Sequence, residues 1–176
     1  LWSLAPHDVS VALYLLGEEQ ALDVSARGSC YLQPQRGVED VVFATVNFPG
    51  GRMLHLHVSW LDPHKIRRIT VVGSKKMAVF DDGASTEKLC IYDKGVETVD
   101  YESYGDLLTL RYGDIHIPHV PMSEPLRIEC EHFTECVAQG KQPLTDGRSG
   151  MAVVQVLEAA QRSLERGGAP VPVERA

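Results

Sequence analysis

In the stretch Arg52-Met53-Leu54-His55-Leu56-His57-Val58-Ser59-Trp60, apolar and polar side chains alternate from Leu54 to Trp60. Successive side chains of a β-strand point to opposite faces of a sheet, so His55 and His57 are expected on one face. The opposite face receives the apolar set Leu54, Leu56, Val58 and Trp60. Pro49-Gly50-Gly51 in front of the stretch is typical of a hairpin turn. The pattern predicts a strand with one apolar face that enters from a tight turn.

Working outward, the chain shows further short segments rich in Val, Ile, Thr and aromatic residues, each bounded by turn residues. They are Leu22–Leu32, Asp40–Phe48, Ile66–Val72, Met77–Phe80, Lys88–Tyr92 and Leu107–Tyr112. Gly73-Ser74-Lys75 predicts a second hairpin turn. Because hairpins join antiparallel neighbours, we expect a mostly antiparallel sheet.

Helical patterns stand at both ends of the chain. Pro6–Leu16 carries an apolar helical stripe, a second helix is predicted from Glu124-Pro125 to Gly140, and a third over Met151–Leu164. Asp146 or Ser149 is expected to cap the start of the third helix. The order predicts an α+β fold, namely one domain over residues 1–176 with an open antiparallel sheet and helices packed on one face. We expect the uncovered face, with His55 and His57, to meet another copy of the chain.

Composition excludes several classes of function. The chain has 176 residues and a formal charge of −7, and its densest basic stretch is only Lys65 to Lys76, so we expect no nucleic-acid partner. Val9–Leu16 is far shorter than the ~20 apolar residues that span a bilayer, so we expect no membrane partner. Cys30, Cys90, Cys130 and Cys136 form no C-x-x-C pair and no signal peptide is evident, which predicts reduced thiols in a cytoplasmic protein.

Two further observations suggest a piece of a larger protein. The sequence begins without Met and enters a helix almost at once, so we expect it to be a fragment. No G-x-G-x-x-G occurs in it, so we expect no NAD(P) site on this chain.

His7-Asp8 at a helix start is the first candidate site. An imidazole with an unperturbed pKa near ~6.5 can take or give a proton at neutral pH, so His7 is a candidate general acid or base. The alternatives are a histidine that only caps the helix, and an HD-type metal site. The metal site would need further ligands on an all-helical scaffold.

His55 and His57 share the spacing of a metal-binding pair, but no carboxylate or Cys stands at a matching position, so no metal is predicted. Lys65 and Arg67 lie before a predicted strand and could meet a substrate phosphate or carboxylate. A solvated charge run is equally compatible with them. Strand alternation directs Arg68 away from Arg67.

Several longer motifs carry a family resemblance. They are Trp2-Ser3-Leu4-Ala5-Pro6-His7-Asp8, Ser59-Trp60-Leu61-Asp62-Pro63-His64-Lys65-Ile66-Arg67, residues 72–82 (VGSKKMAVFDD), Glu129-Cys130-Glu131-His132-Phe133 and Pro143-Leu144-Thr145-Asp146-Gly147. Together they resemble the C-terminal domain of the Gfo/Idh/MocA oxidoreductases, which includes the glucose-fructose oxidoreductase-like enzymes. Within the family, the chain is most similar to nucleotide-sugar dehydrogenases of the UDP-N-acetylglucosamine or UDP-N-acetylglucosaminuronate 3-dehydrogenase type.

The resemblance implies an N-terminal Rossmann domain that holds NAD or NADP, outside this chain, and a sugar or nucleotide-sugar substrate. It assigns the catalytic histidine to His7. The family pattern places an Asp four residues earlier, where this sequence has Ser3. A hydroxyl there can hydrogen-bond, but it does not stabilise an imidazolium as a carboxylate does.

Two hypotheses remain open at this point. In the first, the chain is the substrate-binding and oligomerisation half of an NAD(P)-dependent sugar dehydrogenase, assembled as a homodimer or homotetramer. In the second, it is a non-catalytic module that self-associates through its sheet.

Overall fold

The computed structural model describes residues 1–17, 20–64, 66–97 and 109–174. They form two compact units. The first unit comprises Leu1–Asp62 and Glu129–Ala176, and the second comprises Pro63–Ile128. The predicted α+β architecture with antiparallel strands is confirmed, and the strands divide between two four-stranded sheets.

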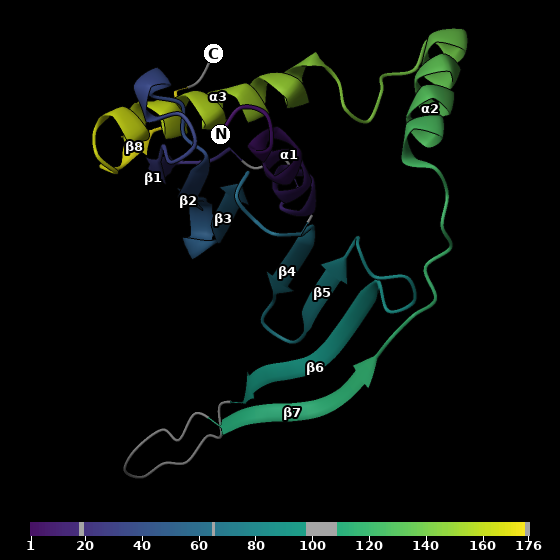
Figure 1. Ribbon diagram of the computed structural model, residues 1–176. Helices are drawn as coiled ribbons and strands as arrows, with labels where there is room; N and C mark the ends of the chain where they lie inside the picture. Colours follow the sequence, from purple (N-terminus) through teal and green to yellow (C-terminus); the bar gives the residue numbers. More distant parts are fainter. Residues whose placement is uncertain (18–19, 65, 98–108, 175–176) are drawn as a thin grey trace. The chain divides into compact units, whose positions relative to one another are not determined.

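The first unit is built around the sheet β3-β2-β1-β8 (Figure 1). Its strands are β1 (Asp23–Ser29), β2 (Val41–Asn47), β3 (Met53–Ser59) and β8 (Val171–Pro172), and all pairings are antiparallel. Short 3-10 turns η1 (Pro34–Arg36) and η2 (Pro49–Gly51) lie between strands. Gly50 and Gly51 have φ of +70° and +75°, which glycine adopts without strain, so the predicted β2–β3 hairpin forms here.

Helices α1 (Ala5–Leu15) and α3 (Gly147–Glu165) cover one face of this sheet. On α1 the buried residues Ala5, Val9 and Leu13 recur every four positions, which places them on a single helix face. From the strands and α3, the core receives Val24, Ala26, Val42, Ala44, Val46, Leu56, Val58, Val156, Leu157, Ala159, Ala160 and Val171. The predicted packing of helices on one sheet face is confirmed.

The alternation predicted for Arg52–Trp60 is confirmed within β3 itself. Leu56 and Val58 are buried, whereas His55 and His57 are exposed on the opposite face. Trp60 is an exception, because it follows the last residue of β3 and is 62% exposed.

Ser163 of α3 connects the helix to the sheet. Its side chain is fully buried, and its hydroxyl accepts a hydrogen bond from the Ala26 backbone N–H at 2.8 Å. The same hydroxyl donates to the Ala169 carbonyl at 2.7 Å. The Ser163 side chain on α3 therefore hydrogen-bonds both to β1 and to the segment that leads to β8.

The start of α3 lies four residues before the predicted one. Asp146 is the N-cap, and its Oδ1 accepts from the backbone N–H groups of Arg148 and Ser149, each at 2.9 Å. The predicted cap is thus confirmed for Asp146. These bonds, with the one from Ser149 the largest cause and one from the Gln142 side chain next, lower the pKa of Asp146.

The second unit contains the sheet β4-β5-β6-β7, also antiparallel. Its strands are β4 (Arg68–Val72), β5 (Met77–Asp81), β6 (Leu89–Glu97) and β7 (Thr109–His116). The predicted start of β7 at Leu107 lies outside the described residues. The predicted hairpin turn after β4 forms, with the Gly73 N–H donating to the Lys76 carbonyl at 3.0 Å.

Helix α2 (Pro125–Gln139) runs between β7 and α3 in the sequence. No helix in the described part of the chain combines the length and the apolar character needed to cross a membrane.

Candidate active site

His7 lies in the first turn of α1, as predicted. Pro6 stands just before it, where a proline fits a helix start because its missing N–H has no partner there. The N-cap residue Leu4 makes no side-chain capping bond. Instead, the N–H groups of Leu4 and Ala5 donate to the Leu1 carbonyl at 3.3 and 3.1 Å, which closes a turn in front of the helix.

The imidazole of His7 is exposed. Val9 on the same helix is buried, so the first turn is anchored while His7 stays accessible. The Trp2 indole N–H also donates to the Gln161 side chain of α3 at 3.2 Å, which fixes the segment before the helix. This arrangement leaves His7 free to meet a molecule from outside the first unit.

Ser3 is exposed and lies in the turn between Leu1 and Ala5. It stands four residues before His7, a spacing that brings side chains to the same side of a helical turn. No hydrogen bond joins these two described residues in the structure. The pairing implied by the family pattern stays a prediction.

Arg67 belongs to the second unit, directly before β4, and Lys65 lies outside the described residues. The Arg67 guanidinium is 59% exposed and is 3.7 Å from the Asp82 carboxylate. The Asp82 N–H also donates to the Arg67 carbonyl at 3.0 Å. Asp82 therefore contacts Arg67 twice, through a backbone hydrogen bond and through an ion pair. Much of the Arg67 guanidinium still faces solvent.

Lys88 and Arg68 lie near this pair, and of the two only Lys88 was not singled out from the sequence. Lys88 is buried, with its side chain 8% exposed, and its Nζ donates to the Asp82 carbonyl at 2.6 Å and lies 3.6 Å from the Asp82 carboxylate. Arg68 donates to Asp81 Oδ2 at 2.7 Å, and this bond is the largest cause of the lowered pKa of Asp81. The Asp81-Asp82-Gly83 turn could have indicated these ion pairs in the sequence, because two consecutive carboxylates often pair with nearby basic residues.

His55 and His57 lie on the outer face of the first sheet, which α1 and α3 do not cover. The His57 ring stacks on Phe43 of β2, with centroids 4.5 Å apart and planes inclined by 5°. His55 Nδ1 is 3.5 Å from the Thr45 hydroxyl. Among the described residues no group of three or more potential ligands could hold a metal ion.

The described residues do not fit a dinucleotide. Both sheets are antiparallel, and no glycine-rich turn joins a strand to the start of α1, α2 or α3 in the manner of a Rossmann unit.

Comparison with solved structures shows the same fold in several sugar oxidoreductases. The aldose-aldose oxidoreductase from Caulobacter crescentus, complexed with glycerol, is 21% identical to this chain and has a TM-score of 0.70. The match covers 96% of this chain and 45% of the oxidoreductase. The UDP-N-acetylglucosamine 3-dehydrogenase GnnA from Acidithiobacillus ferrooxidans is also 21% identical, with 93% and 46% covered and a TM-score of 0.71. A levoglucosan dehydrogenase in complex with NADH is 19% identical, with 99% and 50% covered and a TM-score of 0.73.

The chain thus spans about half the length of these structures. No curated protein matches its sequence significantly. The model of an oxidoreductase family, described as its C-terminal alpha/beta domain, matches residues 1–173. The chain therefore belongs to the Gfo/Idh/MocA oxidoreductase family, of which it forms the C-terminal domain.

Proposed function

We propose that this chain is the substrate-binding and oligomerisation domain of an NAD(P)-dependent dehydrogenase that acts on a hydroxyl of a sugar or nucleotide sugar. The exposed imidazole of His7, held at the start of an anchored helix, is the observation that carries the proposal. Family membership and the sugar dehydrogenases among the structural relatives support the substrate class. The four cysteines are unpaired, which supports a cytoplasmic location.

Oxidation of a carbinol removes one proton from oxygen and one hydride from carbon. In the proposal His7 accepts the hydroxyl proton, and it returns the proton in the reverse direction. The nicotinamide, held by a Rossmann domain outside this chain, supplies the hydride acceptor. Ser3 stands where the family pattern has an Asp, and its hydroxyl adds no negative charge beside the imidazole.

Arg67 is the proposed contact for a substrate phosphate or carboxylate, with Lys65 beside it in the sequence. A guanidinium matches the planar geometry of such anions, and the 3.7 Å contact with Asp82 leaves room for a second partner. Arg67→Gln is expected to raise KM about tenfold for an anionic substrate and to change kcat little. Arg52→Gln serves as the control, because Arg52 follows η2 in the other unit.

The test of the proton transfer uses the protein that joins this domain to its nucleotide-binding domain. His7→Ala is expected to lower kcat by about 10²-fold or more, and His119→Ala, which removes another exposed histidine, is expected to leave it unchanged. Ser3→Asp is expected to raise kcat and move the basic limb of its pH profile upward, because a nearby negative charge favours imidazolium. If His7→Ala retains full turnover, the proposed role of His7 is wrong.

The oligomerisation role rests on the outer face of the first sheet. Phe43 is 49% exposed and Met53 64% exposed there, beside the His57 and His55 rings. Covering these side chains against a second copy would remove apolar surface from water. Light scattering should detect a dimer or tetramer that Phe43→Glu dissociates, while Tyr14→Glu, on exposed α1 surface, does not. A monomer well above micromolar concentration would refute this role.

The same face supports the second candidate, a self-associating module without chemistry of its own. Ser3 in place of the family's acid favours it. The turnover of the His7→Ala variant distinguishes the two candidates. It falls only if the domain takes part in the dehydrogenase reaction.

A further inference from the structure

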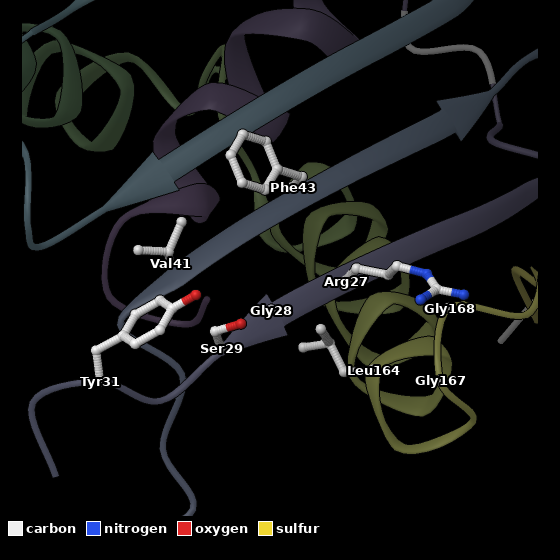
Figure 2. Close-up of a pocket in the computed structure, with 9 residues that line it drawn as sticks. All are labelled: Arg27, Gly28, Ser29, Tyr31, Val41, Phe43, Leu164, Gly167 and Gly168. Atoms are coloured by element: carbon white, nitrogen blue, oxygen red, sulfur yellow. The ribbon is translucent and has the colours of Figure 1, made fainter. Parts of the chain in front are cut away.

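A hollow of about 300 Å³ opens at the end of β1 in the first unit. Figure 2 shows its two ends, with Arg27 beside Gly168 on one side and Tyr31, Val41 and Phe43 on the other. None of the residues proposed for the dehydrogenase site lines it. The hollow therefore requires its own explanation.

The cationic end is built by close packing. A Cβ on Gly168 would lie 2.6 Å from Arg27 Nε and 2.7 Å from its Cγ, so the Arg27 stem rests directly on the Gly168 backbone. Gly168 also has a φ of +91°, which other residues rarely adopt. A Cβ on Gly28, in the floor of the hollow, would lie 2.9 Å from the Val41 carbonyl. Gly168 thus allows the Arg27 side chain to pack against the backbone, and Gly28 allows β1 to lie close to the Val41 carbonyl.

The charge of Arg27 is not neutralised within the described part of the chain. No described carboxylate forms an ion pair with Arg27, whereas Arg68 pairs with Asp81 and Arg162 pairs with Glu174. A guanidinium at the rim of a hollow can therefore donate two parallel hydrogen bonds to an external carboxylate.

The other end of the hollow is apolar and flat. Tyr31 is 67% exposed and Phe43 is 49% exposed, and Val41 of β2 also lines this end. The hydroxyls of Tyr31 and Ser29 add hydrogen-bonding groups near the centre (Figure 2). Aromatic rings pack against such surfaces by offset stacking or edge to face.

We propose that this hollow binds a small aromatic carboxylate, with the carboxylate on Arg27 and the ring against Tyr31 and Phe43. The volume equals roughly ten water molecules at about 30 Å³ each, which suits a ligand of about ten non-hydrogen atoms. It lies at the lower end of the range for small-molecule pockets. This site is independent of the proposed proton transfer at His7. It shares Phe43 with the proposed contact between copies, so ligand binding and self-association through Phe43 are expected to compete.

Phenylacetate is the probe. Two matched compounds separate the contribution of its ring to binding from that of its charge. Phenylacetamide keeps the size and ring but has no charge, and acetate keeps the charge without the ring. With the ¹⁵N-labelled chain, phenylacetate is expected to shift the amide signals of Gly28, Gly167 and Gly168 in a saturable way. Both matched compounds are expected to bind at least tenfold more weakly.

Variants then locate the site. Arg27→Gln is expected to weaken phenylacetate binding at least tenfold, whereas Arg36→Gln, which removes an exposed arginine from η1, is expected to leave it unchanged. Tyr31→Ala is expected to weaken it severalfold by removing the ring contact. Circular dichroism of each variant checks the fold, and Arg27→Lys provides a second test that keeps the charge and the stem and should retain part of the affinity.

The proposal is overturned if phenylacetamide binds as tightly as phenylacetate, or if Arg27→Gln and Arg36→Gln behave alike. It is also overturned if no saturable shift occurs, or if the shifted amides lie away from the hollow.

Discussion

The two sheets of this chain have equal strand numbers and the same antiparallel pairing, yet they distribute apolar side chains differently. In the first sheet most apolar residues gather on the face under α1 and α3, and the opposite face is largely polar, with Val41, Phe43 and Met53 as its apolar members. In the second sheet both faces carry apolar residues. The pairs Ile69–Phe80 and Ala78–Ile91 lie on one face, and Met77–Tyr92 and Val79–Cys90 on the other.

Burial follows from this distribution. Many apolar residues of the first unit are buried, whereas Lys88 is the one buried residue among the described residues of the second unit. Alternation with a period of two gives one sheet a core of its own, while apolar residues on both faces of the other require a cover on each side. We therefore expect most of the folding free energy to come from the first unit.

The largest expected effect is a core truncation in the first unit. Leu157→Ala removes a side chain that is 2% exposed and is expected to lower the free energy of unfolding by about 2–5 kcal/mol. Phe80→Ala, the matched change in the second unit, truncates a half-buried ring and is expected to cost about 1 kcal/mol. Urea denaturation followed by far-UV circular dichroism measures both. Equal losses would contradict the contrast between the units.

The next effect concerns the hydroxyl that links α3 to β1. Ser163→Ala leaves the buried Ala26 N–H and the Ala169 carbonyl without this partner, which is expected to cost about 1–3 kcal/mol. Amide hydrogen exchange at Ala26 should accelerate. Ser149→Ala, which removes a half-buried hydroxyl from the α3 start, is the comparison. Unchanged exchange at Ala26 would show that the bridge does not hold the strand edge.

A smaller effect is expected for the buried lysine of the second unit. Lys88→Met keeps the apolar stem and removes the amine that contacts Asp82. Because Asp82 remains 46% exposed and hydrated, the expected cost is about 1 kcal/mol or less. Exchange of the amides from Asp81 to Leu89 gives the local measure. If Lys88→Met lowered the free energy of unfolding as much as Leu157→Ala, the second unit would have a cooperative core around Lys88.

The smallest effect is an acid dependence shared by both units. The folded-state pKa values of Asp146 and Asp81 are lowered from 3.8, so each carboxylate stabilises the fold above the unfolded pKa. That contribution is lost as the pH falls through the folded pKa. Asp146→Asn should therefore flatten the decline in α3 helicity below about pH 4. Glu165→Gln, near the other end of α3, should leave that acid decline intact.

Local features were predictable from the sequence because local chemistry determines them. The helix over Pro6–Leu16 was found at Ala5–Leu15, and Asp146 caps α3. The early start of α3 was missed because Gly147 and Gly150 lower helix propensity, and the cap outweighs that cost.

Long-range features were not predictable in the same way. Strand β8 has two residues and is identifiable only by its pairing with Asp23 and Val24. The division into two sheets depends on which strands pair, and alternation within a strand does not specify its neighbour. The hollow at Arg27 required the positions of Tyr31 and Gly168, which are separated by more than a hundred residues.

The order β3-β2-β1-β8 has a consequence for synthesis on the ribosome. The first unit is discontinuous, so its apolar sheet face is made by Asp62 but lacks α3 and β8 until Val171 has been translated. At roughly 5–20 residues per second, the delay is about 5 to 20 s. During that interval the nascent chain presents Val42, Ala44 and Val46 without α3, one of the two helices that cover them, and it is then a natural client for chaperones.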